Sequence, residues 1–348
     1  MSGGVDSSVA AALLKQQGYE VIGAHMQLGR AVGGPAPRPC CTSRTGLDAC
    51  RVAAKLDIPF HIFDLEDEFR EIISYFCREY DRGRTPNPCI LCNRQLKFGR
   101  LLVRAEELGC SLVATGHYAR VVKSGGAEEV RLFRASDRAK DQSYVLFSLR
   151  RTQLRRALFP LGELSKREVR LIASELGLHV QGKPESQDIC FAPGGDYRLI
   201  LDEFLPGRVR PGVILDSDGR EIGTHEGYQL YTIGQRRKIG AHAARRYVVR
   251  IDAESNTLIV GPDAELHHRE FTVSDVNWIA SAARDAFEAV IQIRSQHKGA
   301  RGTVEPMGEG RVRVRFAEPQ RAITPGQAAV FYRDDEVLGG GWIESVGA

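Results

Sequence analysis

The first half of the chain alternates short apolar runs with stretches in which apolar residues recur at helical spacing. The helical spacing predicts four helices, at Ser7–Gln17, Leu47–Leu56, Glu66–Tyr80 and Arg94–Leu108. The apolar runs between them predict three strands, at Val21–Met26, Pro59–Leu65 and Ser111–His117. This alternation predicts an α/β fold, with a mostly parallel sheet and helices on both of its faces.

After Pro206 the pattern changes to short apolar runs separated by turn sequences. Alternation of arginine with apolar residues at 311–316 is typical of a strand with one buried face. We therefore expect a nucleotide-binding domain at 1–194, a small β-rich linker domain at 195–268 and a β-barrel-like domain of six or seven strands at 269–348.

Composition supports a folded globular protein of several domains. The 348 residues are 43% hydrophobic, 26% charged and 7% aromatic, which excludes a disordered or fibrous chain. The sequence has no apolar run long enough for a membrane span, and its start, MSGGVDSS, lacks the features of a signal peptide. We therefore expect a cytoplasmic protein without a membrane partner.

Charge and cysteine content are compatible with an RNA partner and with several roles for the cysteines. The net charge is +4, and the positive residues are mostly arginine, which suits phosphate contacts and permits an RNA partner. Eight cysteines in a chain of this length are too few for a disulfide scaffold. They are instead core residues, metal ligands or reactive thiols, and Cys50, Cys77 and Cys110 are expected in the core.

The segment SGGVDSS at 2–8 leads directly into the first predicted helix. Two glycines allow close backbone approach, and the helix start with Ser7 and Ser8 presents N–H and O–H donors to an anion. The segment lacks the Gly-Lys-Ser/Thr of a Walker loop, so Asp6 would help hold Mg²⁺ on a leaving pyrophosphate. The simpler alternative is a Gly-Ser helix cap.

SGGVDSS resembles the loop of ATP-pyrophosphatases, enzymes that adenylate a carbonyl oxygen and then displace AMP. Together with further motifs, the chain resembles the tRNA-specific 2-thiouridylase family over nearly its full length. These motifs are TPNPCILCNRQLKF (85–98), ATGHYAR (114–120), KDQSY (140–144), LFPLGELSK (158–166), SQDICF (186–191), YTIGQRRKIG (231–240), TPGQAAVFY (324–332) and LGGGWI (338–343).

The resemblance implies that ATP adenylates the 2-oxygen of a wobble uridine and that a cysteine persulfide supplies sulfur in its place. Cys190 would carry the persulfide and Cys92 would be its partner, although local sequence also fits a buried structural thiol at Cys190. The resemblance also implies that ATP binds to Ser2, Gly3, Gly4, Val5, Asp6, Ser7, Ser8, Met26 and Gly116. For two of these residues the local sequence has a simpler explanation: Met26 could be an ordinary core residue, and Gly116 could belong to a turn.

The chain departs from the family pattern at Cys89, where well-described members carry Asp. Cys89, Cys92 and Cys190 could ligate an iron–sulfur cluster that binds sulfide; the alternative is a redox pair in which Cys89 tunes Cys92. A zinc site that adds Cys40 or Cys41 has weaker support. Members also carry a strand before the glycine loop, whereas Met1 directly precedes Ser2 here, so we expect a misassigned start.

The resemblance also implies contacts with tRNA. The target base would lie near Asn87, Pro88 and Cys89. Ser295 replaces the tyrosine of a family Arg-Tyr pair, which removes a stacking ring. The other expected tRNA contacts are His117, Lys140, Asp141, Gln142, Arg294, Ser295 and Gln327.

These features predict a monomeric enzyme that needs ATP, Mg²⁺, tRNA and a sulfur donor, either a cysteine desulfurase or a relay protein. Two alternatives stay open at this point. One is another ATP-pyrophosphatase synthetase, although the sequence shows no glutaminase half. The other is a non-catalytic tRNA- or metal-binding relative.

Overall fold

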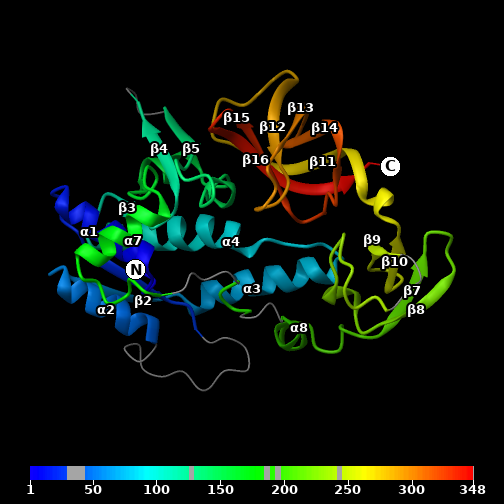
Figure 1. Ribbon diagram of the computed structural model, residues 1–348, viewed down its shortest axis with the longest axis horizontal. Helices are drawn as coiled ribbons and strands as arrows, with labels where there is room; N and C mark the ends of the chain where they lie inside the picture. The colour runs from blue at the N-terminus through cyan, green and yellow to red at the C-terminus, as the bar shows by residue number, and fades with distance from the viewer. Residues whose placement is uncertain (30–43, 125–128, 184–188, 193–196, 241–244, 348) are drawn as a thin grey trace. The chain divides into compact units, whose positions relative to one another are not determined.

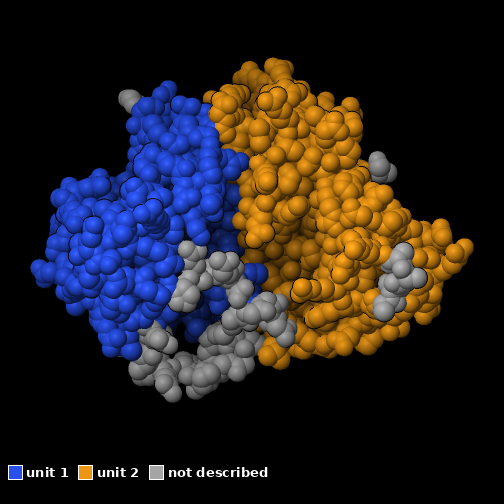
Figure 2. Space-filling view, viewed as in Figure 1, with its two compact units in different colours: residues 1–71, 89–194, 335–337 blue, residues 72–88, 195–334, 338–348 orange. Residues whose placement is uncertain are grey.

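The computed structural model describes residues 1–29, 44–124, 129–183, 189–192, 197–240 and 245–347. The chain forms two compact units, which Figure 2 colours blue and orange. Unit 1 comprises residues 1–71, 89–194 and 335–337, and unit 2 comprises residues 72–88, 195–334 and 338–348. Among the described residues, no helix is both long and apolar enough to cross a membrane.

Unit 1 has the α/β architecture that the sequence predicts. Its strand pairs β1–β2 and β3–β6 are both parallel, but they form separate two-stranded sheets among the described residues. The elements along this part of the chain are α1 (Val5–Gln16), β1 (Gly23–Gln27), α2 (Arg44–Lys55), β2 (Phe60–Asp64), α3 (Glu66–Asp81, continuing into unit 2), α4 (Pro88–Leu91), η1 (Cys92–Arg100), α5 (Leu101–Glu107), β3 (Val113–Ala114), β4 (Ala119–Lys123), β5 (Val130–Arg134), η2 (Ser143–Val145), α6 (Arg151–Arg155), β6 (Ala157–Leu158) and α7 (Lys166–Glu175).

The core of unit 1 forms where α1 packs against α7. Val9 of α1 is fully buried together with Val169 and Ala173 of α7. Alanine dominates the buried positions of α1, so the two helices can approach closely. This packing holds the start of α1 beside the start of α7.

A π-helix interrupts the predicted helix Arg94–Leu108. In Figure 1, α4, η1 and α5 form one continuous helical rod, and η1 is its π-helical part. Gln153 Nε2 donates hydrogen bonds to the carbonyl oxygens of Arg94 (2.8 Å) and Phe98 (2.6 Å). The Gln153 amide therefore satisfies two carbonyl groups within the widened helix.

Strands β4 and β5 form an antiparallel hairpin in unit 1. Glu336 and Val337, the first residues of β16 (Glu336–Val346), pair with β5 in antiparallel register. Arg131 also holds Glu336 through two hydrogen bonds of 2.7 and 2.6 Å. The hairpin is thus fixed by backbone pairing and by a bidentate ion pair.

Unit 2 is rich in strands, as predicted. A four-stranded sheet has the order β8–β7–β10–β9, in which β10 and β7 are parallel. The elements of this part are α8 (Arg198–Phe204), β7 (Gly212–Asp216), β8 (Glu221–His225), η4 (Tyr228–Leu230), β9 (Tyr247–Asp252), β10 (Thr257–Gly261), η5 (Asp263–Leu266), β11 (His267–Trp278), β12 (Phe287–Gln292), β13 (Ala300–Gly308), β14 (Arg311–Arg321) and β15 (Ala328–Arg333).

The strands β11 to β16 form a closed barrel. Their order is β11–β14–β13–β12–β15–β16, and β16 pairs back with β11. Val312, Val314 and Phe316 are buried in the barrel core, which confirms the alternation read from the sequence. The predicted boundaries at 194/195 and 268/269 stay predictions.

Candidate functional site

Ser2–Ser8, called the glycine loop below, leads into α1. Gly4 is the N-cap of α1 and has no side chain of its own, and the described residues form no side-chain cap at this helix start. Ser8 Oγ donates to the Gly4 carbonyl (2.8 Å), and Ser7 Oγ accepts from the Ser2 backbone N–H (3.1 Å). The uncapped N–H groups at the helix start are therefore available to an anion.

Two glycines bring backbone segments close together at the loop. Gly3 has φ +72°, and a Cβ there would lie 2.3 Å from the Thr45 carbonyl oxygen. A Cβ at Gly116 would lie 2.7 Å from the backbone of both Asp6 and Ser7. The structure thus places Gly116 against the glycine loop, while Met26 lies half-buried in β1.

Asp6 is bonded to two side chains that the sequence motifs did not connect with it. Lys166 Nζ lies 2.6 and 2.8 Å from the two carboxylate oxygens, and the Tyr118 hydroxyl donates to Oδ1 (2.9 Å). Lys166 is the first residue of α7, which Ser165 and Glu168 begin with a capping box. Lys166 of α7 thus places an ammonium group at the glycine loop, which has no lysine of its own as a Walker loop does.

A second lysine, Lys183, links the glycine loop to α2 through hydrogen bonds. Its Nζ donates to the Gly3 carbonyl (2.8 Å) and to the buried carboxylate of Asp48. His179 Nε2 lies 3.1 Å from the same carboxylate. The hydrogen bond from Lys183, helped by His179, holds the pKa of Asp48 below its usual value.

Cys89, Cys92 and Cys190, together with Lys97, are called the thiol site. Cys92 begins η1, and the three thiols lie close enough that the charges of Cys92 and Cys89 affect Cys190. Burial, followed by repulsion from these two thiols, raises the pKa of Cys190 to about 11, although its side chain still reaches solvent. Burial also raises the pKa of Cys89 and Cys92.

Lys97 supplies a positive charge at the thiol site. Its charge lowers the pKa of all three thiols and so opposes the effect of burial. Its Nζ lies 3.4 Å from Nε2 of His117, whose Nδ1 lies 2.7 Å from Thr115 Oγ1. Sequence reasoning missed Lys97, because a lysine within the motif PCILCNRQLKF shows no sign of its distant partner.

Among the described residues, no group of three or more His, Cys, Asp or Glu side chains is arranged to hold a metal ion. Cys40 and Cys41, on which the zinc alternative depends, lie outside the described residues. Cys77 is buried as predicted, and Cys110 is partly buried. The core prediction for Cys50 is wrong, since this residue of α2 is exposed.

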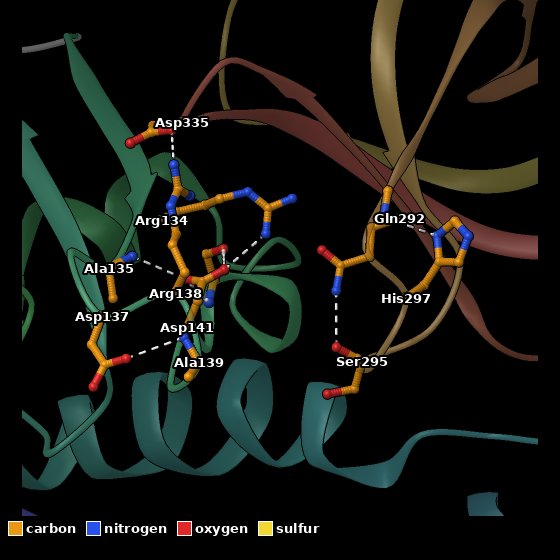
Figure 3. Close-up of polar contacts among 12 residues, drawn as sticks. Arg134, Ala135, Asp137, Arg138, Ala139, Asp141, Gln292, Ser295, His297 and Asp335 are labelled. Atoms are coloured by element: carbon orange, nitrogen blue, oxygen red, sulfur yellow. Dashed lines mark hydrogen bonds and ion pairs between the residues drawn. The ribbon is translucent and has the colours of Figure 1, made fainter. Parts of the chain in front are cut away.

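The predicted tRNA contacts divide between the two units. In unit 1, Asp141 Oδ2 accepts from Arg134 Nη1 (3.0 Å), and Oδ1 accepts from the Ala135 backbone (3.0 Å), as Figure 3 shows. Gln142 Oε1 accepts from the Tyr118 backbone (3.0 Å), and His117 is buried. Asp141 and Gln142 thus have protein partners, and Lys140 beside them is partly exposed.

In unit 2, Arg294 and Ser295 are exposed, and the Ser295 carbonyl accepts from Gln292 Nε2 (3.0 Å) in Figure 3. Gln327 Nε2 donates to the Thr85 carbonyl (2.8 Å). Arg294 therefore offers a charged, accessible group, whereas the Gln327 side chain helps hold its own unit together. Of the predicted target-base residues, Asn87 is half-buried and Pro88 is buried, while Cys89 belongs to unit 1.

Comparison with known families gives three consecutive matches. The tRNA methyl transferase HUP domain matches residues 1–194, the tRNA methyl transferase PRC-barrel domain matches residues 200–262, and the aminomethyltransferase beta-barrel domain matches residues 268–343. With the glycine loop and the closed barrel, these matches define the class as a HUP nucleotide-binding domain followed by a PRC barrel and a β-barrel.

The chain belongs to the tRNA-specific 2-thiouridylase family. Proteins named tRNA-specific 2-thiouridylase from Geobacter metallireducens and Carboxydothermus hydrogenoformans are each 49% identical, over 99% of this chain and 95% and 96% of theirs. One from Chloroflexus aurantiacus is 48% identical over 99% of this chain and 96% of its own. Members are ATP-dependent sulfurtransferases, so the prediction of an enzyme of this class is confirmed.

Proposed function

We propose that this protein replaces the 2-oxygen of a tRNA wobble uridine with sulfur, by adenylating that oxygen with ATP and delivering sulfur from a Cys190 persulfide. The observation that carries this mechanism is the thiol site. Cys92 and Cys190 are 98 positions apart in sequence, yet their thiols interact electrostatically within one unit. A pair of neighbouring thiols is what persulfide chemistry requires.

For the adenylation step, we propose that the uncapped start of α1 binds the phosphates of ATP. Asp6 fits a ligand of Mg²⁺, because it is a carboxylate within the glycine loop with a side chain that is 33% exposed. When bound, Mg²⁺ would neutralise charge on the leaving pyrophosphate. Lys166 and Tyr118 orient the Asp6 carboxylate, and Gly3 and Gly116 leave room for the tight loop.

For the sulfur step, the Cys92 thiolate attacks Sγ of the Cys190 persulfide. A Cys92–Cys190 disulfide forms, the terminal sulfur leaves as hydrosulfide, and this hydrosulfide displaces AMP from C2 of the uridine. The outer sulfur comes from a cysteine desulfurase or a relay protein. An external thiol reductant must restore the two cysteines after each turnover.

The alternative of a cluster on Cys89, Cys92 and Cys190 has less support. The three thiols do not form a metal-ligand group in the described part of the chain. Burial is the main cause of the raised pKa of Cys92, Lys97 opposes it, and the Cys89 thiolate raises this pKa further, so Cys89 is better explained as a neighbour that tunes Cys92.

We further propose that the exposed Arg294 contacts tRNA phosphate, together with Ser295 and Lys140. Asp141, Gln142, His117 and Gln327 would act by holding the elements that carry such contacts, through their hydrogen bonds to other parts of the protein. The protein would work as a monomer. A tRNA substrate is the reason to propose that it works in the cytoplasm.

The test is substitution of the two cysteines. Cys190→Ser and Cys92→Ser should each abolish 2-thiouridine in tRNA, measured by mass spectrometry of digested nucleosides, because serine can neither carry a persulfide nor form the disulfide. Filter binding should show tRNA affinity close to that of the wild type. Cys50→Ser, which removes an exposed thiol outside the thiol site, is the matched control.

Thiolation that persists in Cys190→Ser would overturn the proposed mechanism. Loss of tRNA binding together with thiolation would instead mean that Cys190 acts in binding. Iron that copurifies anaerobically with the wild type, but not with Cys89→Ser, would favour the cluster alternative.

A further inference from the structure

We propose that Lys97 is a positioning residue for sulfur transfer: its ammonium group, held in place by His117, forms an anion site that stabilises thiolate and hydrosulfide at the thiol site. This inference rests on the proposed function for its biological role. Its structural basis is separate, and it concerns the reactivity of the three thiols.

The π-helix brings Lys97 to the side of Cys92. In η1, hydrogen bonds run between residues five apart, so Cys92 and Lys97 lie on the same side of the helix, about one turn apart. An α-helix, with 3.6 residues per turn, would rotate Lys97 about 140° away from Cys92. The local change of helix type therefore has a chemical consequence, because it places the ammonium group beside the thiol.

His117 holds Lys97 without cancelling its charge. The imidazole is buried in a cluster with the rings of Phe98 and Phe159, at centroid distances of 6.4 and 6.1 Å, and these two rings also contact each other. Burial, and then the charge of Lys97, lowers the pKa of His117 well below its usual value, so the ring is neutral. A neutral ring that donates from Nδ1 to Thr115 can accept from Lys97 at Nε2.

No carboxylate forms an ion pair with Lys97 among the described residues. A carboxylate in place of His117 would neutralise the ammonium group and remove its effect on nearby anions. The structure instead surrounds Lys97 with groups that are neutral at pH 7. They are Cys89, Cys92, Cys190 and His117.

A cation that no described carboxylate neutralises, placed among three thiols, favours the anionic form of sulfur. The nucleophile of each transfer is a thiolate or hydrosulfide rather than a thiol. Burial alone would disfavour these anions, and Lys97 counters burial at all three cysteines. The residue thus acts through the cysteines and needs no contact with uridine.

The experiment measures alkylation of the thiols by iodoacetamide as a function of pH, in the full-length protein without ATP or tRNA, with peptide mass spectrometry to separate the cysteines. Lys97→Met should slow alkylation of Cys92 and Cys190 at pH 8 by about tenfold, equal to a rise of one unit in thiol pKa. Lys97→Arg should stay within about twofold, because the charge is kept. Lys123→Met, an exposed lysine on β4, is the matched control.

If the alkylation rates of Lys97→Met depend on pH as those of the wild type do, the proposal is wrong. It is also wrong if Lys97→Arg slows alkylation as much as Lys97→Met, since the shape of the side chain rather than its charge would then matter. Thermal unfolding checks that each variant is folded, and Lys97→Gln repeats the test if methionine disturbs the fold. Because alkylation needs no turnover, thiolation that survives Cys190→Ser would defeat the proposed mechanism and leave this result standing.

Discussion

The glycine loop and the thiol site belong to the same unit, but their charges are arranged differently. At the glycine loop the charges are paired: Asp6 with Lys166, and Asp48 with Lys183. At the thiol site the cation Lys97 has a neutral imidazole as its side-chain partner in the described chain.

This difference in charge pairing indicates how each region interacts with an anion. Paired charges fix the backbone around a cradle whose anion binds at uncapped N–H groups, so the loop is preformed before ATP arrives. A cation whose partner in the described chain is a neutral ring instead favours an anion that forms beside it. Substitutions at the loop should therefore affect folding and ATP use, whereas substitutions at the thiol site should affect sulfur reactivity alone.

The largest effect that would test this contrast is expected from Asp6→Asn. Loss of the carboxylate removes the proposed Mg²⁺ ligand and leaves Lys166 without its ion pair, so pyrophosphate release should fall about a hundredfold. Pyrophosphate release in the presence of tRNA is the measurement. Cys92→Ser is the contrasting variant and should release pyrophosphate at close to the wild-type rate.

If Asp6→Asn and Cys92→Ser reduce pyrophosphate release equally, the two regions are not separate functional halves. If Asp6→Asn leaves pyrophosphate release unchanged, the assignment of this carboxylate to the nucleotide is wrong.

A smaller effect, on stability, is expected at Gly3. Gly3→Ala combines an unfavourable φ of +72° with a Cβ 2.3 Å from the Thr45 carbonyl, and should lower the free energy of unfolding by about 3 kcal/mol. Gly18→Ala is the control, because Gly18 has φ +86° but open space around its Cβ, and should cost about 1 kcal/mol. Urea unfolding of both variants gives the difference.

Equal losses for Gly3→Ala and Gly18→Ala would show that the loop moves away from Thr45 without cost. The glycine loop would then be less rigid than the comparison with the thiol site requires.

The smallest expected effect is the change in the alkylation rate of Cys190 with each pH unit. Its pKa of about 11 lies above the ordinary value of 9.0, so the thiol is protonated at pH 7, and its alkylation rate should rise about tenfold per pH unit towards pH 11. The same shift contributes stability below pH 9 that is lost as the pH rises towards 11. A rate that levels off near pH 8 would contradict a raised pKa.

The sequence predicts most local elements because burial on one face repeats with the period of the element. The helix predicted at Ser7–Gln17 is α1 at Val5–Gln16, and the alternation at 311–316 is buried as Val312, Val314 and Phe316 in β14. The glycine loop is equally local, since its glycines and serines adjoin one another in sequence.

What could not be predicted depends on residues far apart in sequence. The π-helix is supported by Gln153, more than fifty residues beyond η1, and a nine-residue segment is too short for its period to be read from apolar spacing. The pairing of Lys166 with Asp6 joins positions 160 apart. The sequence carries no local sign of either contact, nor of the separation of the parallel strands into two sheets.

The closed ring of β11–β16 has a consequence for synthesis of the protein. Trp278 at the end of β11 leaves the ribosome long before Val346 at the end of β16, by roughly 3 to 14 s at ordinary translation rates. Until then the edge of β11 that β16 will cover has no strand beside it, and nascent chains exposing such an edge are substrates for chaperones. Ribosome stalling within this stretch would therefore be more harmful than stalling earlier in the message.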